Sequence, residues 1–305
     1  MRRAVLLALL LSACMTREPV QVETARGEPI VHAVLRAGTD TVAVLLQRVV
    51  RGDEASAVGV SGAQVEIATG AARTRLAEAP AGFPACVQAA ASSSETTPAG
   101  ALVGCYAGVL PEAVRSGNRY ELHIRERTGA LIRGETTVPA PPLVQAPVAH
   151  ATFEVPRNVS GFGAGGVIRA RLSAPAHTGA SAALAPVTAF EGGRAHPGRQ
   201  CEIPQLRRLR RAGGGASDSA EILLRGPVRC YTTNGSTRRL LTLDSLQAML
   251  LVATYDSATA HYTEALEAGI VPREQASAGL QGALGVFGAS AAARRPVTLI
   301  GPRRQ

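Results

Sequence analysis

Short segments in which apolar and polar residues alternate constrain the fold of this chain more than any other feature of its sequence. The clearest segment places Tyr120, Leu122 and Ile124 at every second position, and residues 63–67 repeat the spacing. Because successive side chains of a β-strand point to opposite faces of its sheet, such runs are typical of half-buried strands. About six short strands, with hardly any helical pattern, fall within 28–138, which predicts an antiparallel β-sandwich.

The residues around Tyr120 indicate which kind of β-sandwich to expect. Gly117 precedes Tyr120 by three positions, so a run of the form Gly-x-x-Tyr-x-Leu-x-Ile enters a late strand. The run resembles the tyrosine corner of immunoglobulin-like sandwiches, in which the tyrosine hydroxyl bonds back to the main chain. We therefore expect an immunoglobulin-like N-terminal domain with a hydrogen bond between the Tyr120 hydroxyl and the backbone.

A proline-rich stretch divides the chain into two parts. Residues 139–147 contain four prolines, and such a segment is stiff, extended and disfavoured inside a sheet, so we expect a linker. The second domain, 148–301, is predicted to be β-rich with one helix, which Asp256 or Ser257 can cap. The fold class is therefore mainly β. Within the second domain, 174–220 is rich in Gly, Ala, Pro and Arg, and we expect a flexible insertion there.

The N-terminal residues are typical of an exported lipoprotein. Two arginines precede an apolar run that is too short to span a bilayer, and small residues then lead to Cys14. The ending of 1–14 looks like a lipobox, whose cysteine is lipidated and becomes the mature N-terminus. Two or more acyl chains hold a protein stably on a membrane. Residues 15–27 are predicted to be a tether between the lipid anchor and the folded domains. Met15, directly after the cysteine, favours the outer membrane, and the protein could lie on either its periplasmic or its surface face.

The four remaining cysteines suit an oxidising compartment, where an even number indicates disulfides. Three pairings are possible, and we favour the one between nearest neighbours, since each bridge would staple a long loop. A zinc site is the rival interpretation, but no C-x-x-C motif or closely spaced histidine accompanies these residues. The predicted disulfides are Cys86–Cys105 and Cys201–Cys230.

The composition argues against a nucleic-acid partner despite a net charge of +9. Trp is absent, and only five Phe and five Tyr are spread over the chain, whereas base stacking requires aromatic side chains. An exported protein also rarely meets nucleic acid. The basic residues, all of them arginine, suit an anionic lipid or lipopolysaccharide surface, or reflect coding bias.

No catalytic or cofactor motif is evident. Residues 161–166 match G-x-G-x-x-G, but a strand-like run follows them, whereas a dinucleotide site needs a helix N-terminus. G-x-S-x-G, H-E-x-x-H and S-x-x-K are missing from the sequence. We therefore predict no catalytic residue, no cofactor and no metal site. The six histidines are scattered along the sequence. His32 and His123 lie in predicted strands, and His177 and His196 lie in the predicted insertion. His261 shares the predicted helix with Glu264 and Glu267, where exposed charges on an amphipathic helix are the simpler interpretation.

Taken together, these features resemble the exported lipoproteins grouped as domain of unknown function 4249. The resemblance covers almost the whole mature chain and rests on the lipobox and three further motifs. It implies an immunoglobulin-like N-terminal domain, a second β domain and no established activity. Members often look like accessories to TonB-dependent outer-membrane transporters. The three motifs are the strand 60–67, the close of the first domain from Gly117 to Pro139, and a helix bearing His261 followed by the glycine-rich 282–288.

The leading functional hypothesis is a non-enzymatic, membrane-anchored binding or accessory module of the cell envelope. A TonB-dependent transporter is the partner that the resemblance suggests. One alternative is an envelope hydrolase whose catalytic residues converge only in three dimensions. Another alternative is a purely structural surface protein.

Overall fold

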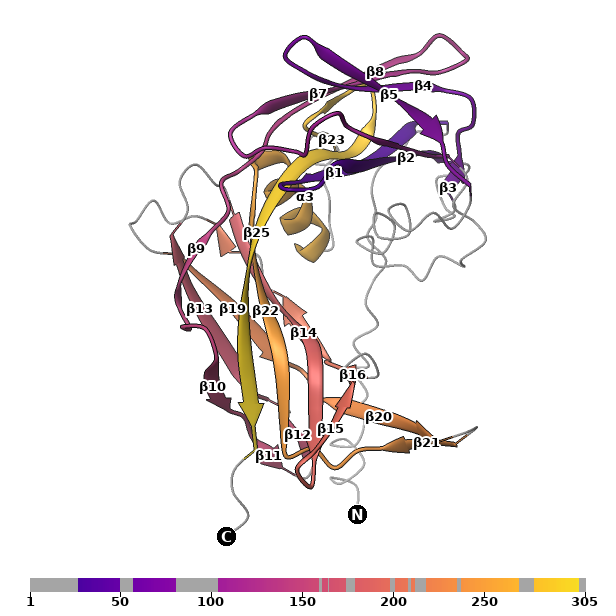
Figure 1. The fold of residues 1–305 in the computed structure, drawn as a ribbon. Helices are drawn as coiled ribbons and strands as arrows, with labels where there is room; N and C mark the ends of the chain where they lie inside the picture. Colours follow the sequence, from indigo (N-terminus) through magenta and orange to yellow (C-terminus); the bar gives the residue numbers. More distant parts are fainter. Residues whose placement is uncertain are drawn as a thin grey trace, which may run out of the picture.

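The computed structural model describes residues 27–49, 57–80, 104–158, 161–163, 165–173, 179–197, 201–207, 210–211, 218–234, 237–268 and 277–301. Over these residues the chain is mainly β, which confirms the predicted fold class, and its helix is α3 (Ser257–Ala268). Figure 1 shows two β units stacked end to end, with the last strand running through both. Each unit has its own hydrophobic core.

The first unit is a sandwich whose strands pair antiparallel in the order β1-β2-β6-β5-β4-β7-β8. The alternation in the sequence explains the two faces of β7, because Tyr120, Leu122 and Ile124 are at most 2% exposed while the residues between them face outward. The strands are β1 (Pro29–Arg36), β2 (Thr41–Val49), β3 (Ala57–Gly59), β4 (Gln64–Thr69), β5 (Ala72–Glu78), β6 (Cys105–Val109), β7 (Arg119–Arg125) and β8 (Leu131–Thr137).

Residues from the far end of the chain close this sandwich. The short strand β24 (Leu280–Gln281) pairs with β8, and the first part of β25 (Leu284–Ile300) pairs in parallel with β1. A further short strand, β23 (Ser277–Ala278), pairs with β25. Leu280, Phe287 and their neighbours therefore belong to the first core. The expected second domain, 148–301, included the whole C-terminal segment. In the structure, the first part of that segment belongs to the first unit instead.

Glycines allow this close approach of the C-terminal segment. Gly285 has φ +100, and a Cβ at this position would lie 1.9 Å from the carbonyl oxygen of Val31 on β1. A Cβ at Gly282, where φ is +84, would lie 2.7 Å from the carbonyl oxygen of Leu131 on β8. Only a residue without a side chain fits both the backbone conformation and the space.

The second unit packs two layers around the other core (Figure 1). One layer has the order β15-β14-β22-β25 with β10 beside β25, and the other has the order β17-β19-β13-β9. Its strands are β9 (Leu143–Ala146), β10 (Ala151–Glu154), β11 (Arg157–Asn158), β12 (Gly161–Phe162), β13 (Val167–Ser173), β14 (Gly179–Glu191), β15 (Arg194–Pro197), β16 (Cys201–Glu202), β17 (Gln205–Arg207), β18 (Arg210–Arg211), β19 (Asp218–Leu224), β20 (Arg229–Asn234), β21 (Thr237–Leu240) and β22 (Ser245–Tyr255).

The expectation of a flexible insertion over 174–220 requires correction at β14, while residues 174–178, 198–200, 208–209 and 212–217 of that range lie outside the described residues. β14 lies inside the large sheet and pairs with β22 along almost its whole length. Many of its buried residues are alanine, and Ala180, Ala182 and Leu184 are at most 3% exposed. An alanine-rich composition therefore belongs here to a strand packed closely against the opposite layer, and not to a loop.

The predicted linker 139–147 is partly a strand. β9 occupies the four residues between its prolines and forms an edge of the smaller sheet, a position in which flanking prolines are tolerated. Val138 belongs to the first core and Val144 to the second, so the division between the cores does fall within this stretch.

The helix α3 begins after Asp256, as the sequence predicts. The backbone N–H of Thr259 donates to Oδ1 of Asp256 at 3.0 Å, which makes Asp256 the N-cap. The same carboxylate accepts hydrogen bonds from the N–H of Ala289 on β25 (3.0 Å) and from the hydroxyl of Thr136 on β8 (2.6 Å). Asp256 thus connects the helix, the last strand and the first sandwich.

Candidate interaction surface

The solvent-facing side of β5, β4, β7 and β8 forms one continuous charged surface, which we call the outer face. The pairing registers place its residues in rows across the four strands. One row consists of Arg75, Glu66, His123 and Arg133, in that order. The remaining charged residues of the outer face are Arg73, Arg119, Glu121, Arg125 and Glu135.

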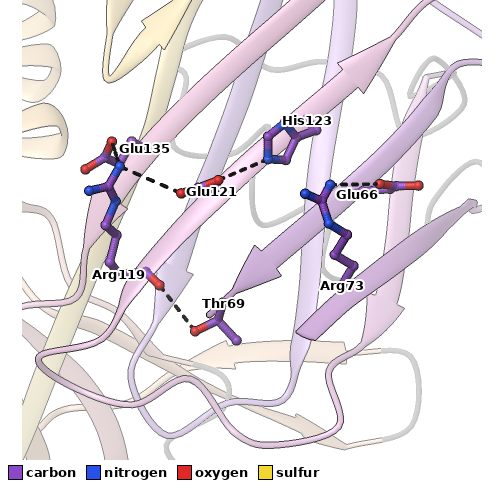
Figure 2. Close-up of polar contacts among 7 residues, drawn as sticks. All are labelled: Glu66, Thr69, Arg73, Arg119, Glu121, His123 and Glu135. Carbon is purple, nitrogen blue, oxygen red and sulfur yellow. Dashed lines mark hydrogen bonds and ion pairs between the residues drawn. The ribbon is translucent and has the colours of Figure 1, made fainter. Parts of the chain in front are cut away.

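Part of the outer face is occupied by ion pairs (Figure 2). Arg119 contacts Glu135 and lies 3.7 Å from Glu121, whose other oxygen approaches Nε2 of His123 at 3.2 Å. Arg73 lies 3.9 Å from Glu66 on the neighbouring strand. The Arg119 side chain is 60% exposed and the Glu121 side chain 43%, so water screens these pairs.

Other arginines of the outer face have no such partner. Arg75, Arg125 and Arg133 are exposed, and no ion pair joins them to any residue in the part of the chain that the structure describes. Five arginines and three glutamates leave this surface with an excess of two positive charges. The outer face therefore presents guanidinium groups that are available to an anionic partner.

The sandwich beneath the outer face is held by two buried tyrosines. The hydroxyl of Tyr120 accepts a hydrogen bond from the N–H of Arg115 at 3.0 Å, which confirms the predicted contact with the main chain. The hydroxyl of Tyr106 donates to the carbonyl oxygen of Val60 at 2.7 Å and accepts from the N–H of Ala63 at 2.9 Å. Burial raises the pKa of Tyr106, which therefore stays neutral.

Two further titratable groups lie inside the first unit. Burial lowers the pKa of His32 from 6.5 to about 4, and its ring lies 6.0 Å from that of Tyr262 on α3. Glu126 is 3% exposed, and its Oε2 accepts hydrogen bonds from Arg48 and from the Thr128 hydroxyl, the latter at 3.2 Å. Its Oε1 has no hydrogen-bond partner among the described residues. A single carboxylate beside an arginine makes an ion pair, and it is a poor metal site.

The remaining residues singled out from the sequence are dispersed. Cys201 and Cys230 lie opposite each other on β16 and β20 and form a disulfide, as predicted. Cys105 is also a disulfide cysteine, while its predicted partner Cys86 lies outside the described residues. Cys14 also lies outside them.

The described part of the chain holds no metal-binding cluster. No group of three His, Cys, Asp or Glu residues there is close enough to hold a metal ion. The glycine-rich 161–166 is followed by the strand β13 and not by a helix, as the sequence predicts. No helix of the described residues combines the length and apolarity needed to cross a lipid bilayer.

The outer face was not predicted from the sequence, although a signal for it exists. Arg119, Glu121, His123 and Arg125 occupy the polar positions of the same alternation that placed Tyr120 in the core. Comparing the polar positions of neighbouring strands, as well as their apolar positions, would have predicted a charged surface here.

No family model matches this chain, and no curated protein matches it. Among solved structures, the chain is similar to a PapD-like domain of human CEP192, with 10% identity over 54% of this chain and 87% of that one and a TM-score of 0.25. Fibronectin(III)-like modules of Clostridium thermocellum CbhA match with 9% identity over 90% and 95% of the two chains, at a TM-score of 0.21. Three N-terminal domains of the outer capsid protein Hoc of bacteriophage RB49 match with 8% identity over 91% and 71%, at a TM-score of 0.24. Similarity at this level identifies neither a family nor a function, and the immunoglobulin-like fold stays a prediction.

Proposed function

We propose that this protein is a non-enzymatic binding module of the bacterial cell envelope that holds an acidic surface of a partner protein on its outer face. The observation that carries the proposal is a group of exposed arginines on a sheet supported by buried tyrosines, and these arginines have no ion-pair partner in the part of the chain that the structure describes. A recognition surface of this kind needs fixed positions for its side chains, and a sheet that is packed on its inner side provides them.

The chemistry of arginine favours carboxylates as the groups recognised. Each guanidinium presents its donors in a planar fork that matches a carboxylate in two-point contact. The existing surface pairs of Arg73 and Arg119 contribute little to stability because they are exposed. An incoming carboxylate can therefore replace Glu66 or Glu135 at low cost.

The location follows from the lipobox ending at Cys14. Lipidation would tether the module to the outer membrane, and a TonB-dependent transporter is the partner suggested by the resemblance of the chain to lipoproteins of unknown function. The disulfide Cys201–Cys230 supports an oxidising compartment outside the cytoplasm. The tether would raise the effective concentration of the module beside a membrane partner.

The test is affinity purification of the full-length protein from crosslinked cells. Reversing two charges of the outer face with Arg75→Glu and Arg133→Glu should reduce recovery of a specific partner at least about tenfold, and added salt should weaken the wild-type interaction. The matched control is Arg171→Glu, an exposed arginine of the second unit, which should leave recovery unchanged. Equal recovery with both variants would overturn the proposal, and Cys14→Ala separates loss of anchoring from loss of the surface.

A further inference from the structure

The first sandwich has two edges, at β1 and β8, and among the described residues the C-terminal segment is what pairs with them. β24 pairs with β8 at Gly134 and Arg133, and β25 pairs with β1 at seven positions from Ile30 to Arg36. Two residues separate β24 from β25, so residues 277–290 cross directly from one edge of the sandwich to the other. Figure 1 shows this crossing beside β1 and β8.

Buried side chains anchor the segment between the two layers. Phe287 is fully buried in the first core, and a Cβ on Gly134 would lie 2.8 Å from its ring. Leu280, Ala283 and Ala289 are also part of this core. Removing the segment would expose this apolar surface, which carries a free-energy cost in water, and would leave unpaired strand edges at β1 and β8.

The second unit holds the same strand from Ser290 onward. β22 pairs with β25 at eleven positions, and Val297 and Leu299 lie in the second core. Asp256, at the start of α3, accepts hydrogen bonds from both Ala289 and Thr136. The segment that closes the first sandwich is thus fixed in position by residues of the second unit.

We propose that residues 277–290 are a strand donor carried by the second unit, so that the first sandwich closes only when the second unit is folded. The gap between β1 and β8 is the acceptor site, and its ligand is an extended segment of this chain with glycine at 282 and 285. The two units then gain and lose structure together. This coupling is independent of any partner that binds the outer face.

The test is hydrogen–deuterium exchange of the full-length protein carrying Ile222→Ala. Ile222 is fully buried on β19 in the second core and is not part of the first core. The substitution should speed exchange of the slowest amides by at least about 30-fold in the second unit. Coupling predicts the same increase in β1 and β7 of the first unit. Unchanged exchange in these two strands would overturn the proposal.

Milder variants keep the test decisive if Ile222→Ala fails to fold. Ile222→Val should speed exchange about 3- to 10-fold in both units. The reciprocal variant Ile124→Val, in the first core, should do the same, whereas independent units would each respond only to their own substitution. Val187→Ala is the control, because this second-unit side chain is 47% exposed and should change exchange in neither unit.

Discussion

The two units close their sheets in different ways. The second unit builds its larger layer from long strands such as β14 and β22, with β25 beside β22, and the disulfide Cys201–Cys230 joins β16 to β20. The first unit leaves a gap between β8 and β1, which a segment from the far end of the chain fills. The comparison teaches that the N-terminal unit, although it is made first, is complete only when the whole chain is present.

The largest expected effect is at the glycine that lets the donor segment approach β1. Gly285→Val should lower the free energy of unfolding by about 4 kcal/mol or more, because a Cβ meets the Val31 carbonyl and φ +100 is disfavoured for valine. Urea denaturation followed by circular dichroism measures the change. Gly129→Val is the matched control, since Gly129 has φ +87 but open space around it, and it should cost only about 1–2 kcal/mol. Equal losses of unfolding free energy for both variants would show that close packing of residue 285 against β1 does not contribute to stability.

Removing the disulfide tests whether a loss of stability in the second unit also affects the first unit. The double change Cys201→Ala and Cys230→Ala releases a loop with a sequence separation of 29 residues. It should lower the free energy of unfolding by about 3 kcal/mol. If the units are coupled, the urea midpoint of unfolding should fall for amides of both units. Hydrogen exchange or NMR measures this midpoint for individual amides. A lower midpoint confined to the second unit would contradict the coupling of the two units.

A pH effect is expected from His32, which β1 presents to Tyr262 of α3. Its folded pKa of about 4 lies below the ordinary 6.5 because of burial, so the unfolded chain binds a proton that the folded chain does not. Stability is therefore complete above pH 6.5 and falls between pH 6.5 and 4, by about 1–3 kcal/mol. His32→Gln should flatten this part of the pH profile. A variant profile as steep as that of the wild type would exclude His32 as the cause.

The smallest expected effect is at the tyrosine of the first sandwich. Tyr120→Phe removes the acceptor for the N–H of Arg115 and should cost about 1 kcal/mol, the usual net value of one hydrogen bond. Thermal unfolding measures it. A loss above about 3 kcal/mol would show that the hydroxyl holds more of the first unit than this single contact.

The sequence predicts what alternation and local chemistry determine. Tyr120, Leu122 and Ile124 were assigned to the core, and Asp256 was one of two expected caps of the helix, because each signal lies within a few residues. The Cys201–Cys230 bridge followed from choosing the nearest neighbour. The mainly β class followed from the same short-range patterns.

What the sequence did not predict depends on contacts between distant residues. β14 falls within the range predicted to be a flexible insertion, because that range is rich in Gly, Ala, Pro and Arg, whereas its burial comes from packing against the opposite layer. The glycines at 282 and 285 suggested a glycine-rich strand, but nothing in the sequence states that its neighbours are Val31 and Leu131. The outer face likewise exists only once four strands are placed in register.

Disulfide trapping tests most directly the claim that the C-terminal strand closes the first sandwich. Arg36 and Ser290 are opposite each other in the β1–β25 pairing, so Arg36→Cys with Ser290→Cys should form a bridge in the oxidised full-length protein. Peptide mapping should find residues 36 and 290 joined, and Arg36→Cys with Ala292→Cys should give far less product. Free thiols at 36 and 290, or equal products from both pairs, would contradict the account.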